Sequence, residues 1–145
     1  MSNHNQPIPQ GKYVPATRFM NTIYTAGMTP RKNGELIQVG KVQLDQDLSH
    51  YKEAVRQAAA NALVAIQGKL QSQEEIQQIL LLNVYVQAEE GFTAHAKLAD
   101  FASEYFVEQL GDVGVGSRAA IGVASLPGNS PIEIQVVASI GRTSQ

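Results

Sequence analysis

Two charged side chains, Arg118 and Glu133, stand in the most apolar part of this sequence, the stretch GSRAAIGVASLPGNSPIEIQVVASI at residues 116–140. A buried charge needs a partner, because its removal from water costs free energy. The planar fork of an arginine matches a carboxylate with two hydrogen bonds, and a nearby glutamate that does not touch the fork can orient or deprotonate a water molecule. Together these residue types predict a site for a small molecule with a carboxylate and a hydrolysable carbon.

Ordinary structural roles are the alternative for both side chains. Arg118 can end a strand with its head in water beyond an aliphatic stem. Glu133 can lie on a solvated face or pair with a surface lysine. These roles require no ligand, so the interpretation depends on where the surrounding elements place the two charges.

The apolar stretch itself predicts two strands, 117–126 and 132–140, which form a hairpin across PGNSP. With Leu126 opposite Ile132, the two charges lie roughly 23 Å apart along the ribbon at about 3.3 Å per residue. They cannot meet within one such hairpin. If they share a site, the simplest geometry brings them together from two subunits.

The rest of the chain predicts an α+β fold. Apolar periodicity and turn signals predict strands at 19–28 and 79–87, a hairpin turn at Asn33-Gly34, and helices at 49–70 and 93–110. These elements predict a mixed six-stranded sheet with both helices on one face. Because the last strands are apolar on both of their faces, the uncovered side of the sheet predicts oligomerisation.

Length and composition limit the number of domains and exclude several classes of site. The 145 residues predict one domain over 1–145, with residues 1–12 as a loose N-terminal arm. A net charge of −2 argues against binding to a nucleic-acid backbone. The chain has no cysteine, which excludes disulfides, a thiol nucleophile and thiolate metal sites and fits a cytoplasmic protein. No apolar run approaches the ~18 residues of a membrane span.

The histidines do not form a metal-binding pattern. His4, His50 and His95 are scattered through the sequence, and no spacing among them is typical of metal ligands. The segment GDVGVGS is rich in glycine but has no lysine after it, so it is interpreted as a turn and not as a phosphate-binding loop. We therefore predict neither a metal nor a cofactor.

Residues 117–138, SRAAIGVASLPGNSPIEIQVVA, resemble the closing signature of the reactive intermediate deaminase family (RidA/YjgF, older label L-PSP endoribonuclease). In that signature an arginine follows a short loop, Leu-Pro closes the strand, and a glutamate follows in an apolar strand. Arg118 and Glu133 match it with the family's spacing of fifteen residues. The segment IYTAGMTP resembles the family's strand ending in Ser-Gly-Gln-x-Pro, and the resemblance extends from about Lys12 to Ser139.

The resemblance implies a chorismate-mutase-like fold and a homotrimer with clefts between its subunits. It also implies hydrolysis of reactive enamine or imine intermediates, which pyridoxal-phosphate enzymes form from amino acids, to 2-oxo acids and ammonia. In this sequence Arg118 would bind the substrate carboxylate and Glu133 would act on water. The Gly27 amide and Tyr13 match further substrate-binding positions of the family. No cofactor is implied.

Three positions depart from the family pattern and make the chain resemble a divergent, YjgF-like branch. Ala26 stands where the family has a serine, and Ala120 stands where it often has a small polar residue or cysteine. The family's substrate-facing asparagine has no direct match, and a gap of about four residues in QAEEGFTAHAKLADF would place Asp100 there. An aspartate beside a substrate carboxylate repels it unless the aspartate is protonated or turned away.

The leading hypothesis is therefore a RidA-like deaminase that acts on a small carboxylate-bearing metabolite. The first alternative is a sensor that binds a 2-oxo acid or a similar carboxylate without turnover, and the residues Ala26 and Ala120 favour it because they lack hydroxyls. The second alternative is the endoribonuclease of the older label. The net charge of −2 and the absence of a histidine pair argue against that activity.

Overall fold

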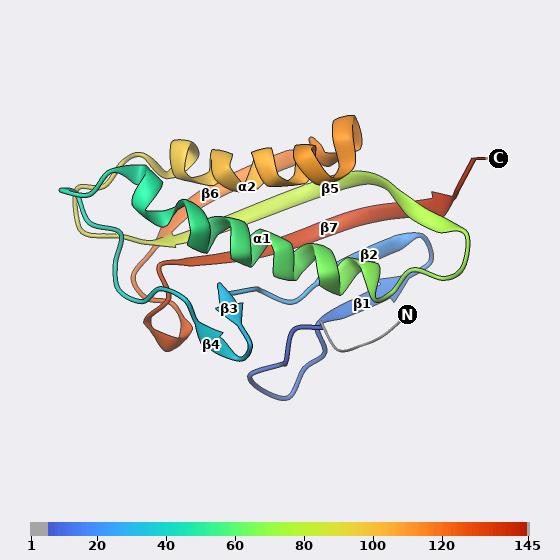
Figure 1. Ribbon diagram of the computed structural model, residues 1–145, viewed down its shortest axis with the longest axis horizontal. Helices are drawn as coiled ribbons and strands as arrows, with labels where there is room; N and C mark the ends of the chain where they lie inside the picture. The colour runs from blue at the N-terminus through green and yellow to red at the C-terminus, as the bar shows by residue number, and fades with distance from the viewer. Residues whose placement is uncertain (1–5, 145) are drawn as a thin grey trace.

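The computed structural model describes residues 6–144, which form a β-sheet with two long helices (Figure 1). The strands and helices, in chain order, are β1 (Ala16–Phe19), β2 (Thr22–Thr25), β3 (Arg31–Lys32), β4 (Glu35–Leu36), α1 (Lys52–Gln67), β5 (Glu74–Gln87), α2 (His95–Leu110), β6 (Ser117–Val123) and β7 (Ile132–Arg142). Single 3-10 turns lie at η1 (Leu48–Tyr51), η2 (Gly111–Gly114) and η3 (Pro127–Asn129).

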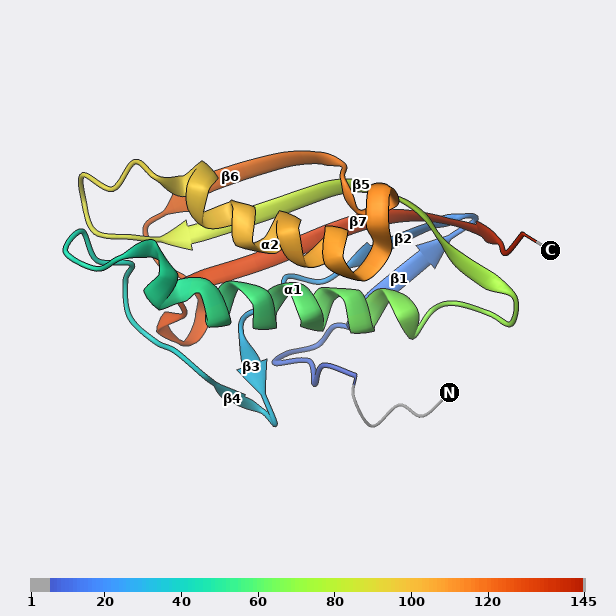
Figure 2. The same ribbon diagram turned by 45° about the horizontal axis from the view of Figure 1, so that its top comes forward.

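The main sheet has five strands in the order β1-β2-β7-β5-β6, and β3 and β4 form a separate two-stranded sheet. β5 and β6 are parallel, whereas the other neighbours are antiparallel, so the main sheet is mixed. Both helices lie side by side on one face of the sheet (Figures 1 and 2). The predicted α+β fold with two helices on one face is confirmed, but the predicted six-stranded sheet is wrong.

Two turns explain the different strand count. Met20 has a φ of 54°, which opens a tight turn, and this turn divides the predicted strand 19–28 between β1 and β2. Asn33 and Gly34 have φ values of 56° and 85°, the left-handed values that a two-residue hairpin turn needs. The predicted hairpin turn is thus confirmed, but it pairs β3 with β4 and keeps both out of the main sheet.

The predicted helices are confirmed, and a side-chain cap precedes the first of them. The side chain of Asp47 accepts a hydrogen bond from the Ser49 amide at 2.9 Å and starts the 3-10 turn that leads into α1. On the sheet side of α1, the small residues Ala58 and Ala62 are fully buried. Their size allows the helix to lie close to the sheet.

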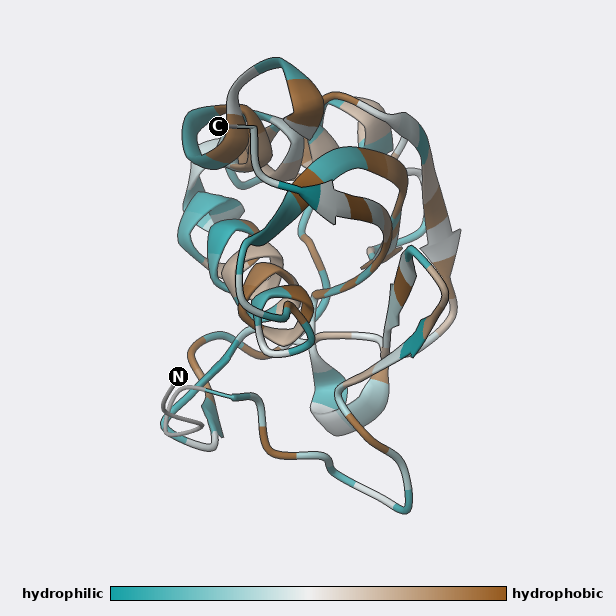
Figure 3. Cartoon of the chain, turned by 90° about the vertical axis from the view of Figure 1, so that its right-hand side faces the viewer, coloured by the Kyte–Doolittle hydropathy of each residue, from teal (hydrophilic) through white to brown (hydrophobic). Residues whose placement is uncertain are grey.

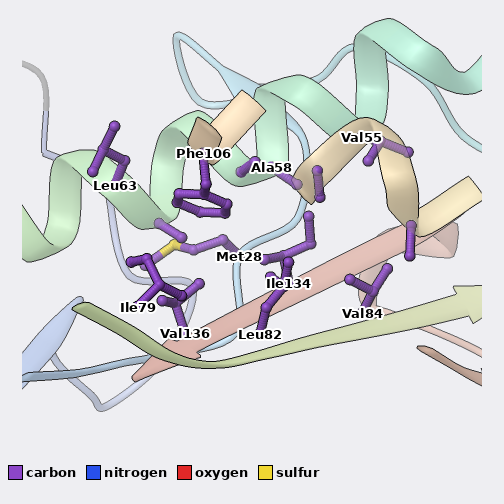
Figure 4. Packing of buried hydrophobic residues seen from close by; sticks show 14 of the residues in the cluster. Met28, Val55, Ala58, Leu63, Ile79, Leu82, Val84, Phe106, Ile134 and Val136 are labelled. Carbon is purple, nitrogen blue, oxygen red and sulfur yellow. The ribbon is translucent and has the colours of Figure 1, made fainter. Parts of the chain in front are cut away.

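The hydrophobic core fills the space between the helices and the sheet. Alternate residues of β7, from Ile132 to Ile140, are buried there. Figure 4 shows Phe106 of α2 directed into this layer beside residues of α1 and above the strands. Figure 3 shows hydrophobic and hydrophilic bands alternating along the strands, as the two-residue period of a strand requires. The intervening residues of β7, including Glu133, therefore point to the opposite face.

The predicted hairpin between residues 117–126 and 132–140 is wrong. β5 lies between β6 and β7, running parallel to β6 and antiparallel to β7. α2 connects β5 to β6 as a crossover, and such crossovers join parallel neighbours. The loop from β6 to β7 then crosses the end of β5, where the buried Gln87 side chain donates hydrogen bonds to Asn129 Oδ1 at 3.0 Å and to the Ser130 carbonyl at 3.1 Å.

The sheet face that points away from the helices carries apolar side chains. Tyr24, Val137 and Leu81 are neighbours across β2, β7 and β5, and Tyr85 and Ile121 are neighbours across β5 and β6. Tyr24 and Ile121 are 47% and 46% exposed. Glu133 and Gln135 of β7 share this face with the apolar side chains, so it is mixed, and the predicted apolarity of both faces holds only in part. Among residues 6–144, no helix lies over this face.

Candidate functional site

Arg118 lies on the edge strand β6 and points to the helix side of the sheet. Its neighbour on β5 is Leu82, which is buried beneath the helices, and residues paired across a sheet share a face. The guanidinium reaches α2, where Nη1 donates to Asp100 Oδ1 at 2.8 Å and to Ser103 Oγ at 3.0 Å, and Nη2 donates to the Ala96 carbonyl at 3.1 Å. Arg118 therefore ties α2 to the edge of the sheet.

The three acceptors come from one face of α2, because residues four and seven apart lie above one another on a helix. They occupy three of the five N–H donors of Arg118. The Nε–H and one Nη2–H have no acceptor within residues 6–144. Two donors thus remain, which is the number that a carboxylate uses in a bidentate contact.

Glu133 lies on the opposite face of the sheet. It neighbours Tyr85 across β7 and β5, on the side without helices. Its side chain is half-buried, and this burial raises the pKa of the Glu133 carboxyl above its ordinary value. Within the described residues it has neither a hydrogen-bond partner nor an ion-pair partner. Such a carboxylate is free to act on a bound molecule.

Gly27 lies directly against Glu133. A Cβ added at Gly27 would come within 2.5 Å of Glu133 Oε2 and 2.8 Å of its Cδ, so the carboxylate occupies the space that any other residue would fill. The segment is held in place by Met28 and Ile134, which exchange backbone hydrogen bonds of 2.7 and 2.8 Å. The Gly27 N–H itself has no acceptor in the described part of the chain. The structure thus brings together two of the predicted site residues.

Tyr13 and Gly27 line one pocket of about 380 Å³, whose walls come from α1, the β3–β4 hairpin and residues 6–10. The Tyr13 hydroxyl accepts a hydrogen bond from the Gln10 amide at 3.0 Å. Of the arm predicted over residues 1–12, Gln6 donates to the Val64 carbonyl of α1 at 2.7 Å. Residues 1–5, including His4, lie outside the described residues.

The predicted site residues therefore form two groups within one chain. Gly27 links the first group, since it lies against Glu133 and lines a pocket with Tyr13 whose walls do not include Glu133. Arg118 and Asp100 belong to the second group. Ala120, two residues after the arginine on the same face of β6, joins the second group and packs against the core. β5 and the thickness of the sheet separate Arg118 from Glu133. The separation of roughly 23 Å along a hairpin is therefore wrong: Arg118 lies opposite Leu82 and Glu133 opposite Tyr85, three residues apart along β5. The two side chains do not meet because they point to opposite faces of the sheet.

Ser103 is a contact of Arg118 that the sequence analysis missed. It follows Asp100 by three residues on α2, among the buried residues Ala99 and Ala102. The sequence signal that could have identified Ser103 is its spacing of three residues from Asp100, which places both side chains on the same side of the helix. Arg18 of β1 is held by an ion pair, in which both of its Nη atoms donate to the Glu74 carboxylate, at 2.6 and 2.7 Å.

Other kinds of site find no support in the described structure. Among residues 6–144, no three His, Asp or Glu side chains gather in an arrangement that would hold a metal ion. None of the helices described there has the length and hydropathy needed to cross a membrane.

Known proteins are similar to this chain in sequence and in fold. A sequence model for the family described as endoribonuclease L-PSP matches residues 3–140. Protein Atu1372 of Agrobacterium tumefaciens, of unknown function, is similar with 31% identity and a TM-score of 0.83 over 92% of this chain and 86% of that one. A candidate endoribonuclease of Shewanella oneidensis is similar with 26% identity and a TM-score of 0.84, over 92% of this chain and 89% of that one. The YjgF gene product of E. coli shares the fold, with 22% identity and a TM-score of 0.67 over 93% of each chain.

Proposed function

Because this chain belongs to the endoribonuclease L-PSP family, we propose that it is a RidA-like hydrolase that deaminates small carboxylate-bearing enamine or imine intermediates. The products are a 2-oxo acid and ammonia. One observation carries the proposal: the half-buried Glu133 carboxylate has no partner within residues 6–144 and lies against Gly27, whose N–H is also free. A base beside a free donor is what the activation of water at a polarised carbon requires.

In the proposed reaction Glu133 takes a proton from water while the water oxygen bonds to the imine carbon. The C=N bond becomes a single bond, and its nitrogen takes up the proton from Glu133. Glu133 then takes the hydroxyl proton of the resulting carbinolamine and passes it to the nitrogen, so that the C–N bond breaks, the C=O group forms and ammonia leaves. Because burial raises its pKa, Glu133 is a stronger base than an ordinary glutamate. An imine carbon is already electrophilic, so the reaction needs no cofactor.

Arg118 is the proposed anchor for the substrate carboxylate. Its Nε–H and one Nη2–H have no acceptor in the described residues, so they are available for a bidentate contact. The Gly27 N–H is the proposed donor to a second substrate oxygen or to the developing oxyanion. Tyr13 and Ala120 are proposed to line the site, Tyr13 from the pocket beside Gly27 and Ala120 from the strand of the arginine.

We place the complete site between copies of this chain, in a homotrimer. Within one chain Arg118 faces α2, whereas Glu133 faces away from the helices, so a second copy is needed to bring the two together. The exposed apolar side chains of Tyr24 and Ile121 on the uncovered face support this assembly, because exposed apolar patches often mark interfaces between proteins. The proposed clefts lie where the edge strand β6 of one copy meets the sheet of another.

The test is ammonia release from 2-iminopropanoate or 2-aminoacrylate generated in solution. We expect the wild type to exceed the spontaneous rate, and Arg118→Ala and Glu133→Gln to lower the enzymatic rate by about 10²-fold or more. Arg56→Ala is the matched control, since Arg56 lies on α1 and pairs with Glu108 away from both groups of site residues. A wild type that matches the spontaneous rate while its assembly is intact would refute the hydrolase function.

A sensor of small carboxylates is the second candidate, and the alanines at positions 26 and 120 favour it. Neither residue offers a hydroxyl or thiol that could assist proton transfer. A sensor would bind pyruvate with a dependence on Arg118 and would release no ammonia from an imine. Isothermal titration of pyruvate beside the ammonia assay therefore separates the two candidates.

RNA cleavage, which the family's description names, is measured in the same preparations. The net charge of −2 gives little attraction for a phosphate backbone. We expect any ribonuclease signal to survive Arg118→Ala and to vary between purification fractions, as a contaminant would. A signal that is constant between fractions and disappears with Arg118→Ala would favour RNA as the substrate.

A further inference from the structure

Asp100 is the feature of the candidate site that the proposed hydrolysis does not explain. Its Oδ1 accepts the hydrogen bond from Arg118 Nη1 at 2.8 Å, so it is neither turned away from the arginine nor remote from the proposed carboxylate position. Its side chain is 56% exposed, and its Oδ2 accepts no hydrogen bond from residues 6–144. A free carboxylate oxygen therefore lies beside the proposed anchor.

This arrangement changes which anions Arg118 can hold. The charge of the guanidinium is already balanced by Asp100, and the neutral Ser103 and the Ala96 carbonyl take the other occupied N–H groups. A plain carboxylate that approaches the two remaining donors meets the Asp100 charge within a few ångströms and is repelled. A ligand whose carboxylate has a cationic nitrogen on the adjacent carbon meets a complementary pair of charges instead.

We propose that Asp100 is a specificity-determining residue that makes this site select small zwitterions, carboxylates with an ammonium or iminium nitrogen on the adjacent carbon, over plain carboxylates. Arg118 binds the carboxylate through its free donors, and the free oxygen of Asp100 binds the cationic N–H. The inference rests on the proposed function in one respect, the assignment of Arg118 as the carboxylate anchor.

The selectivity has a consequence for the proposed reaction. A protonated 2-imino acid is a zwitterion, and its hydrolysis consumes one water to give a 2-oxo acid anion and ammonium, so charge balances. The 2-oxo acid keeps the carboxylate but has lost the cationic nitrogen, and it then faces Asp100 without compensation. Asp100 thus favours binding of the substrate and release of the product.

The test compares two probes that differ only at the adjacent carbon, L-alanine and propionate. Each is titrated into wild-type protein, Asp100→Asn and Ser103→Ala by isothermal calorimetry at low salt. We expect the wild type to bind alanine about fivefold more tightly than propionate. Asp100→Asn should remove this preference, chiefly because propionate binds about three- to fivefold more tightly. Ser103→Ala should keep it, since a neutral contact is lost and the charge remains.

A second variant guards against a structural effect of the substitution. Asp100→Glu keeps the negative charge and should keep the preference for alanine, and Arg118→Ala should abolish binding of both probes. An unchanged ratio in Asp100→Asn, an equal affinity of the wild type for both probes, or no saturable binding of either probe would overturn the inference.

The binding assay and the hydrolase assay test the two inferences separately. If alanine is preferred through Asp100 but no imine is hydrolysed, the selectivity stands and the proposed activity fails. If imines are hydrolysed but Asp100→Asn keeps the wild-type ratio, the activity stands and Asp100 is only a structural partner of Arg118.

Discussion

Gly27 and Glu133 show how a single missing side chain shapes the candidate site. The carboxylate of Glu133 occupies the volume that a Cβ at position 27 would need. Its own strand holds it on the uncovered face, and burial there raises its pKa. The position of the proposed base therefore depends on the absence of atoms at its neighbour as much as on the strand that carries it.

Gly27→Ala should separate stability from activity. The new methyl group displaces the flexible end of Glu133, so we expect the free energy of unfolding to fall by no more than about 1 kcal/mol. We expect ammonia release to fall by about 10²-fold, because the base leaves its position. Urea denaturation and the ammonia assay measure the two effects. A variant with wild-type activity would show that Glu133 does not act from this position.

Glu133→Gln should change how stability depends on pH. A raised pKa in the folded state means that the folded protein binds the proton more tightly than the unfolded chain. The stability of the wild type therefore falls as pH rises from 4.5, the ordinary pKa of a glutamate, through the raised pKa of Glu133. The glutamine variant has no ionisable group at this position and does not lose this stability. Denaturation at pH 4, 6 and 8 should show the variant gaining relative to the wild type as pH rises. The opposite trend would mean that Glu133 has a stabilising partner.

At the scale of elements, the crossover from β5 through α2 to β6 decides where Arg118 points. It makes β6 an edge strand and sets α2 above it, so that the arginine meets Asp100 and Ser103. At the other end of the sheet, Arg18 of β1 ties the start of β5 to the turn after β1, through Glu74 and the Met20 carbonyl. Ion pairs thus join elements at both edges of the sheet.

The pair of Arg18 and Glu74 should support stability only above acidic pH. The guanidinium and the Gln71 amide lower the pKa of the Glu74 carboxyl to about 2, from an ordinary value of 4.5. Its contribution is therefore present above 4.5 and is lost as pH falls toward 2. We expect Glu74→Gln to lower the melting temperature at pH 7 and to match the wild type near pH 2. Glu75→Gln is the control, and an equal effect of both variants at pH 7 would contradict the prediction.

In the described part of the chain, helices cover one face of the main sheet and leave the other uncovered. The covered face packs its alternate residues against two helices, and the uncovered face presents Tyr24 and Ile121 to its surroundings. A small domain with this asymmetry gains stability when copies bury the second face against one another. The proposed site needs the same association, because Arg118 and Glu133 point to opposite faces of the sheet in one chain.

Ile121→Glu should disrupt the proposed trimer. The charge falls on the uncovered face of β6, where association would remove it from water. We expect sedimentation to give three times the chain mass of 15.7 kDa for the wild type and a smaller species for the variant. Val107→Glu, at an exposed position of α2, should keep the wild-type mass. A wild-type monomer that releases ammonia would contradict the placement of the site between subunits.

The sequence by itself determined the features that depend on local spacing. The two helices, the turn at Asn33-Gly34 and the buried apolar row of the last strand follow from residues a few positions apart. The spacing of Arg118 and Glu133 within an apolar stretch identified both as candidate site residues and indicated the family. Only the tertiary structure decided the strand order, the pairing of Arg118 with Asp100 and the contact of Glu133 with Gly27. The strand order and both contacts join segments that lie far apart in the chain. They depend on the crossover between β5 and β6, which has no signature in the spacing of nearby residues.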